Sequence, residues 1–531
     1  MTAERLTIPV LLRRNGETYG PKDVIVTDER SISHTALDDE SRALAGRLVG
    51  AGIGKGARVG LLLPNGVDWV VVASAVTRIG AVIVPLSTLL RPPELAAQLT
   101  VAGVTHLVLA PSFRGRSYLD DLDEVAPDLR RCTRHGRRHP RLPLLRKVWT
   151  LDDLPPERVG DDLVGALERA VRPADDLAVV FTSGSRGAPK GTVHTHGGGL
   201  GAVAAGLDAR CVRADDRLYI PMPFFWTGGF CSGVLTVLVA GATLLTEAVP
   251  EPDGTLALLE RERATLFRGW PDQAARLAAH PRFEAAELSS LRPGSLPAVL
   301  PVGLRPAPGA RANLFGMTET FGPYCGARLD VDLPVAAQGS CGRPFDGIEV
   351  QIADPEPGGV GEVLVRGPNV LRAICGRTRD ATFHADGWYP TGDLGRIDGD
   401  GYLWYQGRVD DMFKVKGATV YPTEVEGALR SLAGVRQAHV TDVVRDDADD
   451  AGDGARAVGA MVVSALTLDE LVDGARARLS AFKVPTCWVV TDSADEVPMT
   501  ATSKVDTAAL RDLLQREGQR TDRGPVDGGG G

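Results

Sequence analysis

The first 110 residues alternate between two patterns of apolar positions. In one pattern, apolar side chains recur three or four positions apart, which predicts amphipathic helices. This pattern occupies residues 38–51, 69–79 and 91–102. The other pattern is a short, nearly continuous apolar run, which predicts strands buried on both faces. These runs occupy residues 57–63, 80–85 and 105–110. The repeated strand–helix order predicts an α/β domain with a parallel or mostly parallel sheet covered by helices.

The pattern changes from about residue 335, where shorter strands alternate with closely spaced Gly, Pro and Asp. Residues 358–366 are one example, and they predict a small antiparallel, barrel-like unit. Beyond residue 417 the chain predicts a further α+β unit, which is typical in size for an independent domain. Its expected helices are residues 424–432 and 468–479, and its expected strands are residues 435–444 and 458–463.

Composition narrows the class of protein. A chain of 531 residues is too long for one ordinary core, and its 44% hydrophobic and 24% charged residues are typical of a soluble globular protein. The net charge of −9 gives no reason to expect nucleic acid binding. The seven cysteines contain no Cys-x-x-Cys pair, which favours reduced thiols over disulfides or a zinc site. Without a signal pattern or a long apolar run, we expect a cytoplasmic protein with no membrane partner.

Residues 181–191, with the sequence FTSGSRGAPKG, form a loop of small residues after the apolar run at 177–180. Glycines let backbone N–H groups approach a phosphate, and Lys190 adds a positive charge. The loop is not a Walker A motif, because Lys190 follows Pro189 and precedes Gly191, and it lacks the Rossmann Gly-x-Gly-x-x-Gly pattern. Taken alone, it is equally compatible with an ordinary surface turn.

Four more segments carry candidate chemistry: residues 314–319, 388–394, 407–417 and 497–504. Each one also has a structural interpretation. Glu319 could be an acid in the first turn of a helix, Asp393 a turn former and Arg408 a surface cation. Lys504 could be a solvated lysine.

In this order and spacing, the five segments resemble the adenylate-forming superfamily of acyl- and aryl-CoA synthetases, carrier-protein adenylation domains and luciferases. The resemblance extends from about residue 20 to 515. It implies an N-terminal domain over residues 1–409, built from two helix-flanked sheets and a small β-barrel. It also implies a smaller, mobile α+β lid domain over residues 410–520, with Asp410 as the hinge. Residues 521–531 are rich in glycine and are expected to be a disordered tail.

The resemblance also implies a set of ATP contacts. The loop would close over the β- and γ-phosphates through Thr182, Ser183, Gly184, Ser185, Arg186, Gly187 and Lys190. Phe315 would lie against adenine, with Gly316 and Met317 giving backbone contacts. Thr318 would hydrogen-bond the α-phosphate, and Glu319 would hold Mg²⁺, a hard cation that prefers oxygen ligands.

The remaining implied contacts lie nearer the C-terminus. Asp393 and Arg408 would bind the ribose, and Lys504 would bridge the substrate carboxylate and the α-phosphate. A swing of the lid domain would withdraw Lys504 and bring the segment from Lys414 to Gly417 toward the site. The implied catalytic group is therefore Lys504, Lys190, Thr318 and Glu319.

These roles imply a two-step reaction that uses ATP and Mg²⁺. A small organic acid attacks the α-phosphorus, pyrophosphate leaves, and a nucleophile then displaces AMP from the acyl-adenylate. The thiol of CoA is the leading expectation for that nucleophile. Three alternatives stay open: loading of a carrier protein, adenylation of nitrite by a diazotising enzyme that acts on an aryl amine, and a catalytically idle scaffold.

The sequence departs from the family pattern at several positions that bear on the substrate. Arg186 stands where threonine is usual, and Ser503 replaces a glycine before the lysine. Trp226 replaces a histidine at a position that often borders the acyl pocket, and the alternative interpretation of Trp226 is a core aromatic. The segment from 291 to 315 is short, and its usual Gly-Gly-Ala-Pro-Leu motif is not recognisable. The expected substrate contacts are Phe225, Trp226, Gly229 and Phe230.

Overall fold

The computed structural model describes residues 6–182, 189–409, 411–415, 418–444, 456–479, 483–500 and 504–521. The predicted hinge residue Asp410 and residues 522–531 of the predicted tail lie outside these ranges. The chain divides into two compact units, each treated by itself below. The first comprises Met1–Val350, Val365–Tyr389 and Asp398–Leu403, and the second comprises Gln351–Leu364, Pro390–Ile397 and Trp404–Gly531.

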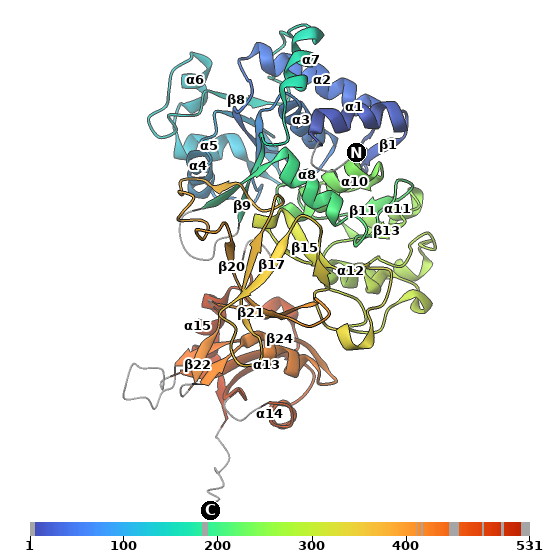
Figure 1. The fold of residues 1–531 in the computed structure, drawn as a ribbon, viewed down its shortest axis with the longest axis vertical. Coiled ribbons are helices and arrows are strands. Elements are labelled where there is room, and N and C mark those ends of the chain that lie inside the picture. The colour runs from blue at the N-terminus through green and yellow to red at the C-terminus, as the bar shows by residue number, and fades with distance from the viewer. Residues whose placement is uncertain are drawn as a thin grey trace, which may run out of the picture. The chain divides into compact units, whose positions relative to one another are not determined.

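A seven-stranded, mostly parallel sheet forms the centre of the first unit (Figure 1). The five strands from β8 to β9 run parallel, β10 joins β9 antiparallel, and β19 at the edge pairs antiparallel with β10. In order across the sheet the strands are β19 (Ala373–Ile374), β10 (Lys190–Thr195), β9 (Asp176–Thr182), β4 (Val82–Pro85), β3 (Arg58–Leu62), β5 (His106–Leu109) and β8 (Lys147–Thr150). This arrangement is the mostly parallel, helix-covered sheet that the sequence predicts.

Both faces of this sheet are buried, as the continuous apolar runs predict. Alternate residues of each strand enter different clusters because successive side chains point to opposite faces. Leu61 and Ile83 pack in the cluster that contains residues of α1 (Ile8–Tyr19), α2 (His34–Gly50) and α3 (Val67–Arg78). Leu62 and Val82 pack instead with α4 (Pro92–Val101), α5 (Tyr118–Val125) and α6 (Leu129–Arg134). The two groups of helices are visible around the sheet in Figure 1.

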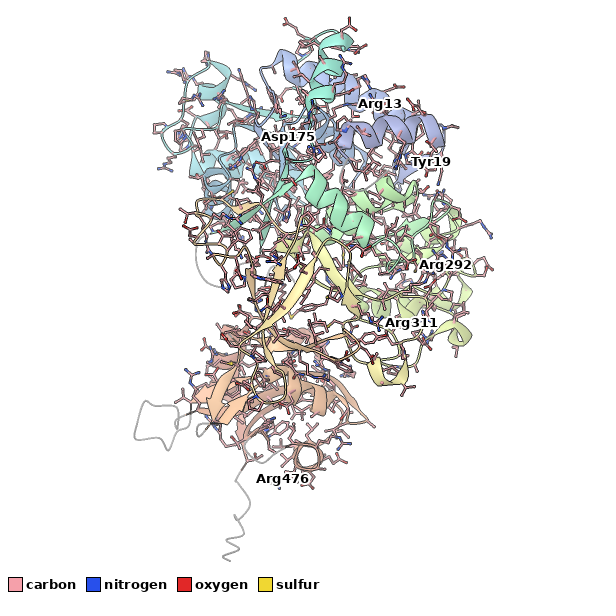
Figure 2. All side chains as sticks on the ribbon, viewed as in Figure 1. Arg13, Tyr19, Asp175, Arg292, Arg311 and Arg476 are labelled. Atoms are coloured by element: carbon pink, nitrogen blue, oxygen red, sulfur yellow. The ribbon has the colours of Figure 1, made fainter. Side chains whose placement is uncertain are left out.

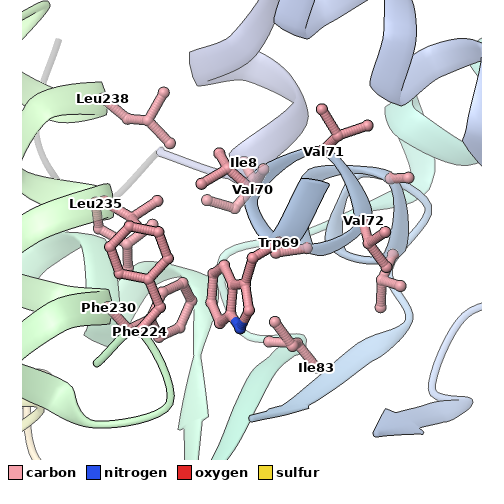
Figure 3. Packing of buried hydrophobic residues seen from close by; sticks show 14 of the residues in the cluster. Ile8, Trp69, Val70, Val71, Val72, Ile83, Phe224, Phe230, Leu235 and Leu238 are labelled. Atoms are coloured by element: carbon pink, nitrogen blue, oxygen red, sulfur yellow. The ribbon is translucent and has the colours of Figure 1, made fainter. Parts of the chain in front are cut away.

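A second, five-stranded sheet belongs to the same unit. Its strands in order are β13 (Leu266–Phe267), β11 (Arg217–Tyr219), β12 (Thr243–Leu245), β1 (Asp23–Val26) and β2 (Ser31–Ser33). All neighbours are parallel except β1 and β2. The core between the sheets is centred on Trp69, whose ring meets Phe224 and Phe230 edge-on, each at 5.3 Å between centroids (Figure 3).

Helices of the first unit connect and cover these strands. They are α1 (Ile8–Tyr19), α2 (His34–Gly50), α3 (Val67–Arg78), α4 (Pro92–Val101), α5 (Tyr118–Val125), α6 (Leu129–Arg134), α7 (Asp161–Ala170), α8 (His196–Ala205), α9 (Thr227–Gly229), the π-helix η2 (Phe230–Leu235), α10 (Thr236–Ala240), α11 (Pro252–Arg261) and α12 (Pro271–Ala278). Charged side chains such as Arg13 on α1 are exposed (Figure 2). No helix among the described residues is long and apolar enough to cross a bilayer.

Smaller sheets follow these layers. An antiparallel three-stranded sheet contains β14 (Phe315–Met317), β15 (Gly322–Gly326) and β16 (Arg343–Pro344). A four-stranded sheet has the order β17 (Glu349–Ala353), β18 (Gly361–Arg366), β20 (Tyr389–Ile397) and β21 (Leu403–Arg408). A two-stranded ribbon joins β6 (Ser112–Phe113) and β7 (Arg116–Ser117).

The C-terminal part of the second unit is an α+β layer structure. Its main sheet has the order β24 (Val435–Val444), β25 (Arg456–Ser464), β26 (Cys487–Thr491) and β27 (Gln519–Arg520). A ribbon of β22 (Phe413–Val415) and β23 (Ala418–Val420) precedes it, and the helices are α13 (Pro422–Arg430), α14 (Leu468–Arg476) and α15 (Thr507–Glu517). One core lies beside α13 and α14 around the buried Trp488, and a second lies beside α15.

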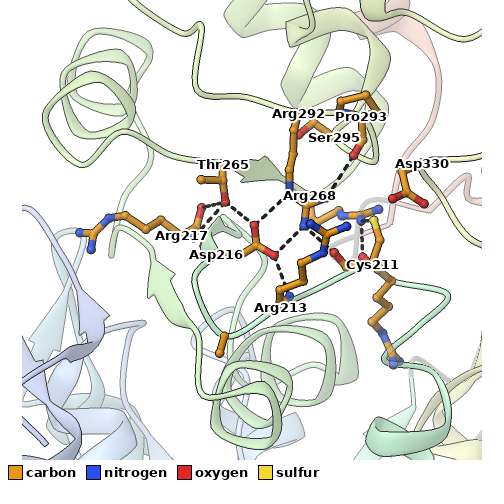
Figure 4. A network of polar contacts seen from close by, with 12 residues as sticks. Cys211, Arg213, Asp216, Arg217, Thr265, Arg268, Arg292, Pro293, Ser295 and Asp330 are labelled. Carbon is orange, nitrogen blue, oxygen red and sulfur yellow. Dashed lines mark hydrogen bonds and ion pairs between the residues drawn. The ribbon is translucent and has the colours of Figure 1, made fainter. Parts of the chain in front are cut away.

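A buried polar network secures the loop before β11 in the first unit (Figure 4). Asp216 accepts hydrogen bonds from Arg292 at 2.6 and 3.0 Å, from Thr265 at 2.7 Å and from the backbone N–H of Arg213 at 2.7 Å. Burial alone would raise the pKa of Asp216, but these hydrogen bonds, led by that of Arg292, outweigh burial and hold the pKa below its usual value. The network joins three segments that are distant in sequence.

Glu247, just after β12, gives a prediction about stability and pH. Burial raises the pKa of its carboxyl group, although hydrogen bonds from Thr255 and Tyr219 oppose the rise. Above the unfolded-state pKa, the unfolded chain loses this proton while the folded chain retains it, so folding stability falls as pH rises toward the folded-state pKa. Glu247→Gln keeps an acceptor oxygen and removes this loss.

We therefore expect the melting temperature of Glu247→Gln to exceed that of wild type by a margin that grows from pH 4 to pH 7. Thermal unfolding across this range measures the margin, and Glu284→Gln, at an exposed position, is the control. A constant margin, or one that shrinks as pH rises, would contradict the inference that folding raises the pKa of Glu247.

Candidate active site

Lys190, Glu319 and Tyr389 meet in the first unit, although they lie far apart in sequence. Lys190 Nζ donates to Glu319 Oε1 at 2.5 Å and to the Tyr389 hydroxyl at 2.7 Å. The Tyr389 hydroxyl also donates to Glu319 Oε1, at 3.3 Å. Glu319 is only 5% exposed, whereas the Lys190 side chain is partly accessible. The Lys190 ammonium group is thus partly exposed to solvent and is held in place by the buried carboxylate of Glu319.

The fold brings these three residues together from separate elements. Lys190 begins β10 and is paired with Thr182 at the end of β9, so the glycine-rich loop connects two adjacent strands. Glu319 lies in the 3-10 turn Thr318–Thr320. The backbone N–H of Leu371 donates to the carbonyl of Glu319 at 2.7 Å and fixes this turn from outside.

The turn that carries Glu319 connects the two strands of a tight hairpin, β14 and β15. Phe315 is half-buried, and its ring meets Tyr324 edge-on at 5.5 Å between centroids. Gly316 lies so close to Gly322 and Pro323 that a Cβ would overlap their backbone atoms. Glycine is therefore required here by the approach of the two strands, and the side chains of Phe315 and Met317 remain partly accessible.

His194 on β10 is a buried neighbour of the same turn that the sequence reasoning did not single out. Its ring lies 4.6 Å from that of Phe321, centroid to centroid. Burial lowers the pKa of His194 to about 3, against the opposing hydrogen bond with the Thr318 backbone. The imidazole is therefore neutral near pH 7 and supports the turn without adding charge.

Asp393 and Arg408 form a second cluster, within the second unit. Arg408 Nη1 donates to Asp393 Oδ1 at 2.9 Å and to the carbonyl of Thr391 at 3.0 Å. Gly392, between Thr391 and Asp393 in sequence, has φ of 72°, and a Cβ there would lie 2.8 Å from Arg408 Nη2. The backbone N–H of Asp393 donates to Thr391 Oγ1 at 3.0 Å, which fixes the carboxylate on its strand.

This geometry leads to a prediction for nucleotide binding. Asp393 is buried and its Oδ1 accepts from Arg408, and a carboxylate can accept several hydrogen bonds, including those of a sugar diol. We expect Asp393→Ala to raise the KM for ATP roughly 10- to 100-fold, since a hydrogen bond to a charged group contributes that much. Steady-state kinetics with varied ATP measures the effect. Asp400→Ala, at an exposed turn, is the control, and an unchanged KM for ATP would contradict the assigned role.

Lys504 is exposed and belongs to the second unit. Its backbone forms a closed turn with Thr500, because the Thr500 N–H donates to the Lys504 carbonyl at 2.7 Å and the Lys504 N–H donates to Thr500 Oγ1 at 3.2 Å. Several other predicted contacts lie outside the described residues. These are Ser183, Gly184, Ser185, Arg186, Gly187 and Asp410, together with the side chains of Thr182 and Lys414.

The predicted acyl contacts divide into a buried and an accessible set. Phe225, Gly229 and Phe230 are buried, and Phe230 also contacts Phe321 at 5.8 Å between ring centroids. Trp226 is partly accessible and meets Trp270 edge-on at 5.6 Å. Trp270, which caps the start of α12, was not singled out by the sequence reasoning because its partner lies 44 positions away.

The side chains near Glu319 can be compared with those that usually hold a magnesium ion. Among the described residues, no three His, Cys, Asp or Glu side chains gather into a metal-binding group. Glu319 is instead a single buried carboxylate beside the strand that begins with Lys190. Such a donor set fits Mg²⁺, which is commonly held by one or two carboxylates and by substrate phosphates.

Comparison with known proteins agrees with these features. The model of the AMP-binding enzyme family matches residues 12–374. A methyl-dioxo-octahydro-indenyl-propanoyl:CoA ligase of Mycobacterium tuberculosis is 33% identical over 522 residues, covering 96% of this chain and 99% of that protein. A feruloyl-CoA synthase of an Amycolatopsis species is 31% identical and covers 91% of this chain and 94% of its own length.

The fold also matches a solved structure of an anthranilate CoA ligase in complex with anthranoyl-AMP. The TM-score is 0.77 at 23% identity, with 97% of this chain and 99% of that chain covered. The chain therefore belongs to the AMP-binding enzymes of the adenylate-forming superfamily and is an AMP-forming ligase. Its α/β architecture is the one that the motifs predict.

Proposed function

We propose that this enzyme activates an organic acid as its acyl-adenylate and then transfers the acyl group to the thiol of CoA. The observation that carries the proposal is the cluster of Lys190, Glu319 and Tyr389, in which a partly accessible cation and a buried carboxylate flank the ends of β9 and β10. This arrangement offers both a contact for phosphate oxygens and a ligand for the accompanying Mg²⁺.

In the first half-reaction, a carboxylate oxygen of the acid attacks the α-phosphorus of ATP. A P–O bond to that oxygen forms, and the bond between the α-phosphorus and the bridging oxygen breaks, so that pyrophosphate leaves. Lys190 would bind the departing phosphates, and Lys504 would neutralise charge between the carboxylate and the α-phosphate. A bound Mg²⁺ would neutralise phosphate charge beside Glu319. Asp393 and Arg408 would hold the ribose in place.

In the second half-reaction, the CoA thiolate attacks the acyl carbon, the thioester C–S bond forms and AMP leaves. The acyl C–O bond to the phosphate breaks, and the thiol proton goes to solvent. The hinge at Asp410 and the approach of the segment from Lys414 to Gly417 belong to this step in our proposal. The domain limits 1–409 and 410–520 are part of the same proposal.

An aromatic or polycyclic acid is the substrate class that we favour. Trp226 and Trp270 present two partly accessible indole rings at an edge-to-face contact, and flat apolar groups pack well against such surfaces. The names of two relatives contain a bicyclic propanoyl group and a feruloyl group. We propose that this enzyme also accepts bulky cyclic acids of this kind.

The test separates catalysis from acceptor choice. Purified enzyme is given ATP, Mg²⁺ and a panel of aryl, bicyclic and straight-chain acids, and pyrophosphate release is measured first. AMP release is then compared with CoA, with a carrier protein and with nitrite plus an aryl amine. Acid-dependent pyrophosphate release followed by CoA-dependent thioester formation supports the proposal. Turnover only with a carrier protein, or only with nitrite and an amine, would overturn the choice of CoA, and no pyrophosphate with any acid would overturn the activity.

A further inference from the structure

Arg210 is a deeply buried arginine in the first unit. It lies one turn beyond α8, where its backbone N–H donates to the carbonyl of Gly206 at 3.0 Å. Its exposed fraction is 4%, and within the described ranges its side chain makes a single hydrogen bond, from Nη1 to the carbonyl of Val203 at 3.3 Å. Nε and Nη2 are buried and donate to no atom of the described chain.

The guanidinium of Arg210 also lacks a counter-charge. The buried Arg78 pairs with Asp38 at 2.6 Å and with Glu168 at 2.7 Å, and Arg292 pairs with Asp216 at 2.6 Å. Unlike Arg78 and Arg292, Arg210 forms no ion pair with a carboxylate in the described ranges. An isolated buried charge is costly, and structures normally compensate it with a partner of opposite charge.

The nearest neighbours do not supply that charge. Burial lowers the pKa of Arg210, and Cys231 opposes this effect. Burial also raises the pKa of the Cys231 thiol to about 11 despite the adjacent guanidinium, so the sulfur is a neutral thiol near pH 7. Arg210 therefore places a positive charge in the interior, and its Nε and Nη2 donors have no acceptor within the described chain.

The position of Arg210 connects it with the predicted acid site. A Cβ on Gly322 would lie 3.1 Å from Cys231 Sγ and 3.7 Å from Arg210 Nη2, so these three residues converge. Gly322 lies two residues after the turn that carries Glu319, and Cys231 directly follows Phe230, a predicted acyl contact. Cys231 also lies in the π-helix η2, a rare wide helix that is frequent at functional sites.

We propose that Arg210 binds a second oxygen acceptor of the acid substrate, a carboxylate or ketone remote from the carboxylate that reacts. This inference rests on the proposed function and refines it, because it names the substrate class as a bifunctional acid. A planar guanidinium whose Nε and Nη2 lack acceptors suits an oxygen acceptor. A carboxylate would in addition neutralise the buried charge. Arg210 is thus a specificity residue and takes no part in the bond changes at phosphorus.

The test uses sets of acids that share a skeleton and size. One set is 3-(4-isopropylphenyl)propanoate, 3-(4-acetylphenyl)propanoate and 3-(4-carboxyphenyl)propanoate, and matched straight-chain and bicyclic sets accompany it. For each acid, kcat/KM for pyrophosphate release is measured with wild type, Arg210→Met and Arg213→Met. Arg213 lies three positions away and is exposed, so its variant controls for the loss of one charge.

We expect wild type to prefer the keto or carboxy member of at least one set over its apolar isostere. Arg210→Met should lower kcat/KM for that member roughly 10- to 150-fold, since hydrogen bonds to a charged group have this strength. The same variant should leave the apolar isostere unchanged or improved, and Arg213→Met should behave as wild type. Because Arg210→Met removes an uncompensated charge, its melting temperature should equal or exceed that of wild type.

Other outcomes overturn the inference. In the first, wild type shows no preference for acids that bear the second acceptor. In the second, Arg210→Met still releases pyrophosphate but lowers kcat/KM equally for both members of a set. Either result would remove the inference and leave the proposed function intact. If no acid releases pyrophosphate, both fail together. Should Arg210→Met not fold, Arg210→Lys replaces it; this variant keeps the charge and loses the planar fork, and an unchanged preference in it would also contradict the assignment.

Discussion

Replacing Lys504 with alanine should lower the rate of adenylate formation about 10²- to 10³-fold, the typical effect of removing one group that stabilises charge in a transition state. Transfer from a preformed acyl-adenylate to CoA should stay close to the wild-type rate. The reason is that charge accumulates between the attacking carboxylate and the α-phosphate only in the first half-reaction. The exposed turn that Lys504 forms with Thr500 leaves the ammonium group accessible for that role.

Single-turnover assays of the two half-reactions measure this difference. Lys483→Ala is the matched control, because Lys483 belongs to the same unit and pairs with Glu424 at 2.6 Å. This control should leave both half-reactions unchanged. Equal losses in the two half-reactions of Lys504→Ala, or no loss in adenylation, would contradict the role assigned to Lys504.

The second large effect is expected for Glu319→Gln. The substitution keeps the size of the side chain but removes the buried negative charge that Lys190 contacts at 2.5 Å and that would bind Mg²⁺. Adenylation should slow about 10²- to 10³-fold at fixed Mg²⁺, by the same electrostatic reasoning. The Mg²⁺ concentration for half-maximal rate should also rise.

Tyr389→Phe separates the charge of Glu319 from the local hydrogen bonds. It removes the hydroxyl that contacts both Lys190 and Glu319 but preserves both charges. Its effect on rate should be smaller than that of Glu319→Gln, and its Mg²⁺ requirement should stay near wild type. A Glu319→Gln enzyme with an unaltered Mg²⁺ requirement would count against Glu319 as a metal ligand. Melting temperatures of both variants establish that the fold persists.

The helices and strands that the hydrophobic pattern predicts correspond to elements of the structure. The run at residues 105–110 corresponds to β5 (His106–Leu109), and the period at residues 468–479 corresponds to α14 (Leu468–Arg476). Helix starts were less accurate, because they depend on capping groups. The helix predicted from residue 38 begins at His34, where Ser33 accepts a hydrogen bond from the Ala36 N–H at 3.1 Å and ends the preceding strand.

The site was predictable where residue type and spacing carry the chemistry. Glu319, Asp393, Arg408 and Lys190 could be singled out because the segments that carry them resemble, in order and spacing, the motifs of the adenylate-forming superfamily. Their pairing could not be predicted, since the contact between Lys190 and Glu319 spans 129 positions.

The supporting residues had no such local signal. Trp270 and His194 gain their roles only from folded neighbours, Trp226 and the Thr318 backbone respectively. Arg210 is one of many arginines in the sequence, and only its burial without a counter-charge distinguishes it. Tertiary structure was therefore needed to identify the residues that surround the motif.

The most direct test of the central claim is acid-dependent exchange of labelled pyrophosphate into ATP. This exchange requires that ATP be cleaved reversibly between its α- and β-phosphates, with the acid held as an adenylate. We predict that label enters ATP only when an accepted acid and Mg²⁺ are present, that CoA is not needed, and that Lys504→Ala slows the exchange about 10²- to 10³-fold. Release of ADP and inorganic phosphate in place of exchange, across the whole acid panel, would contradict the account.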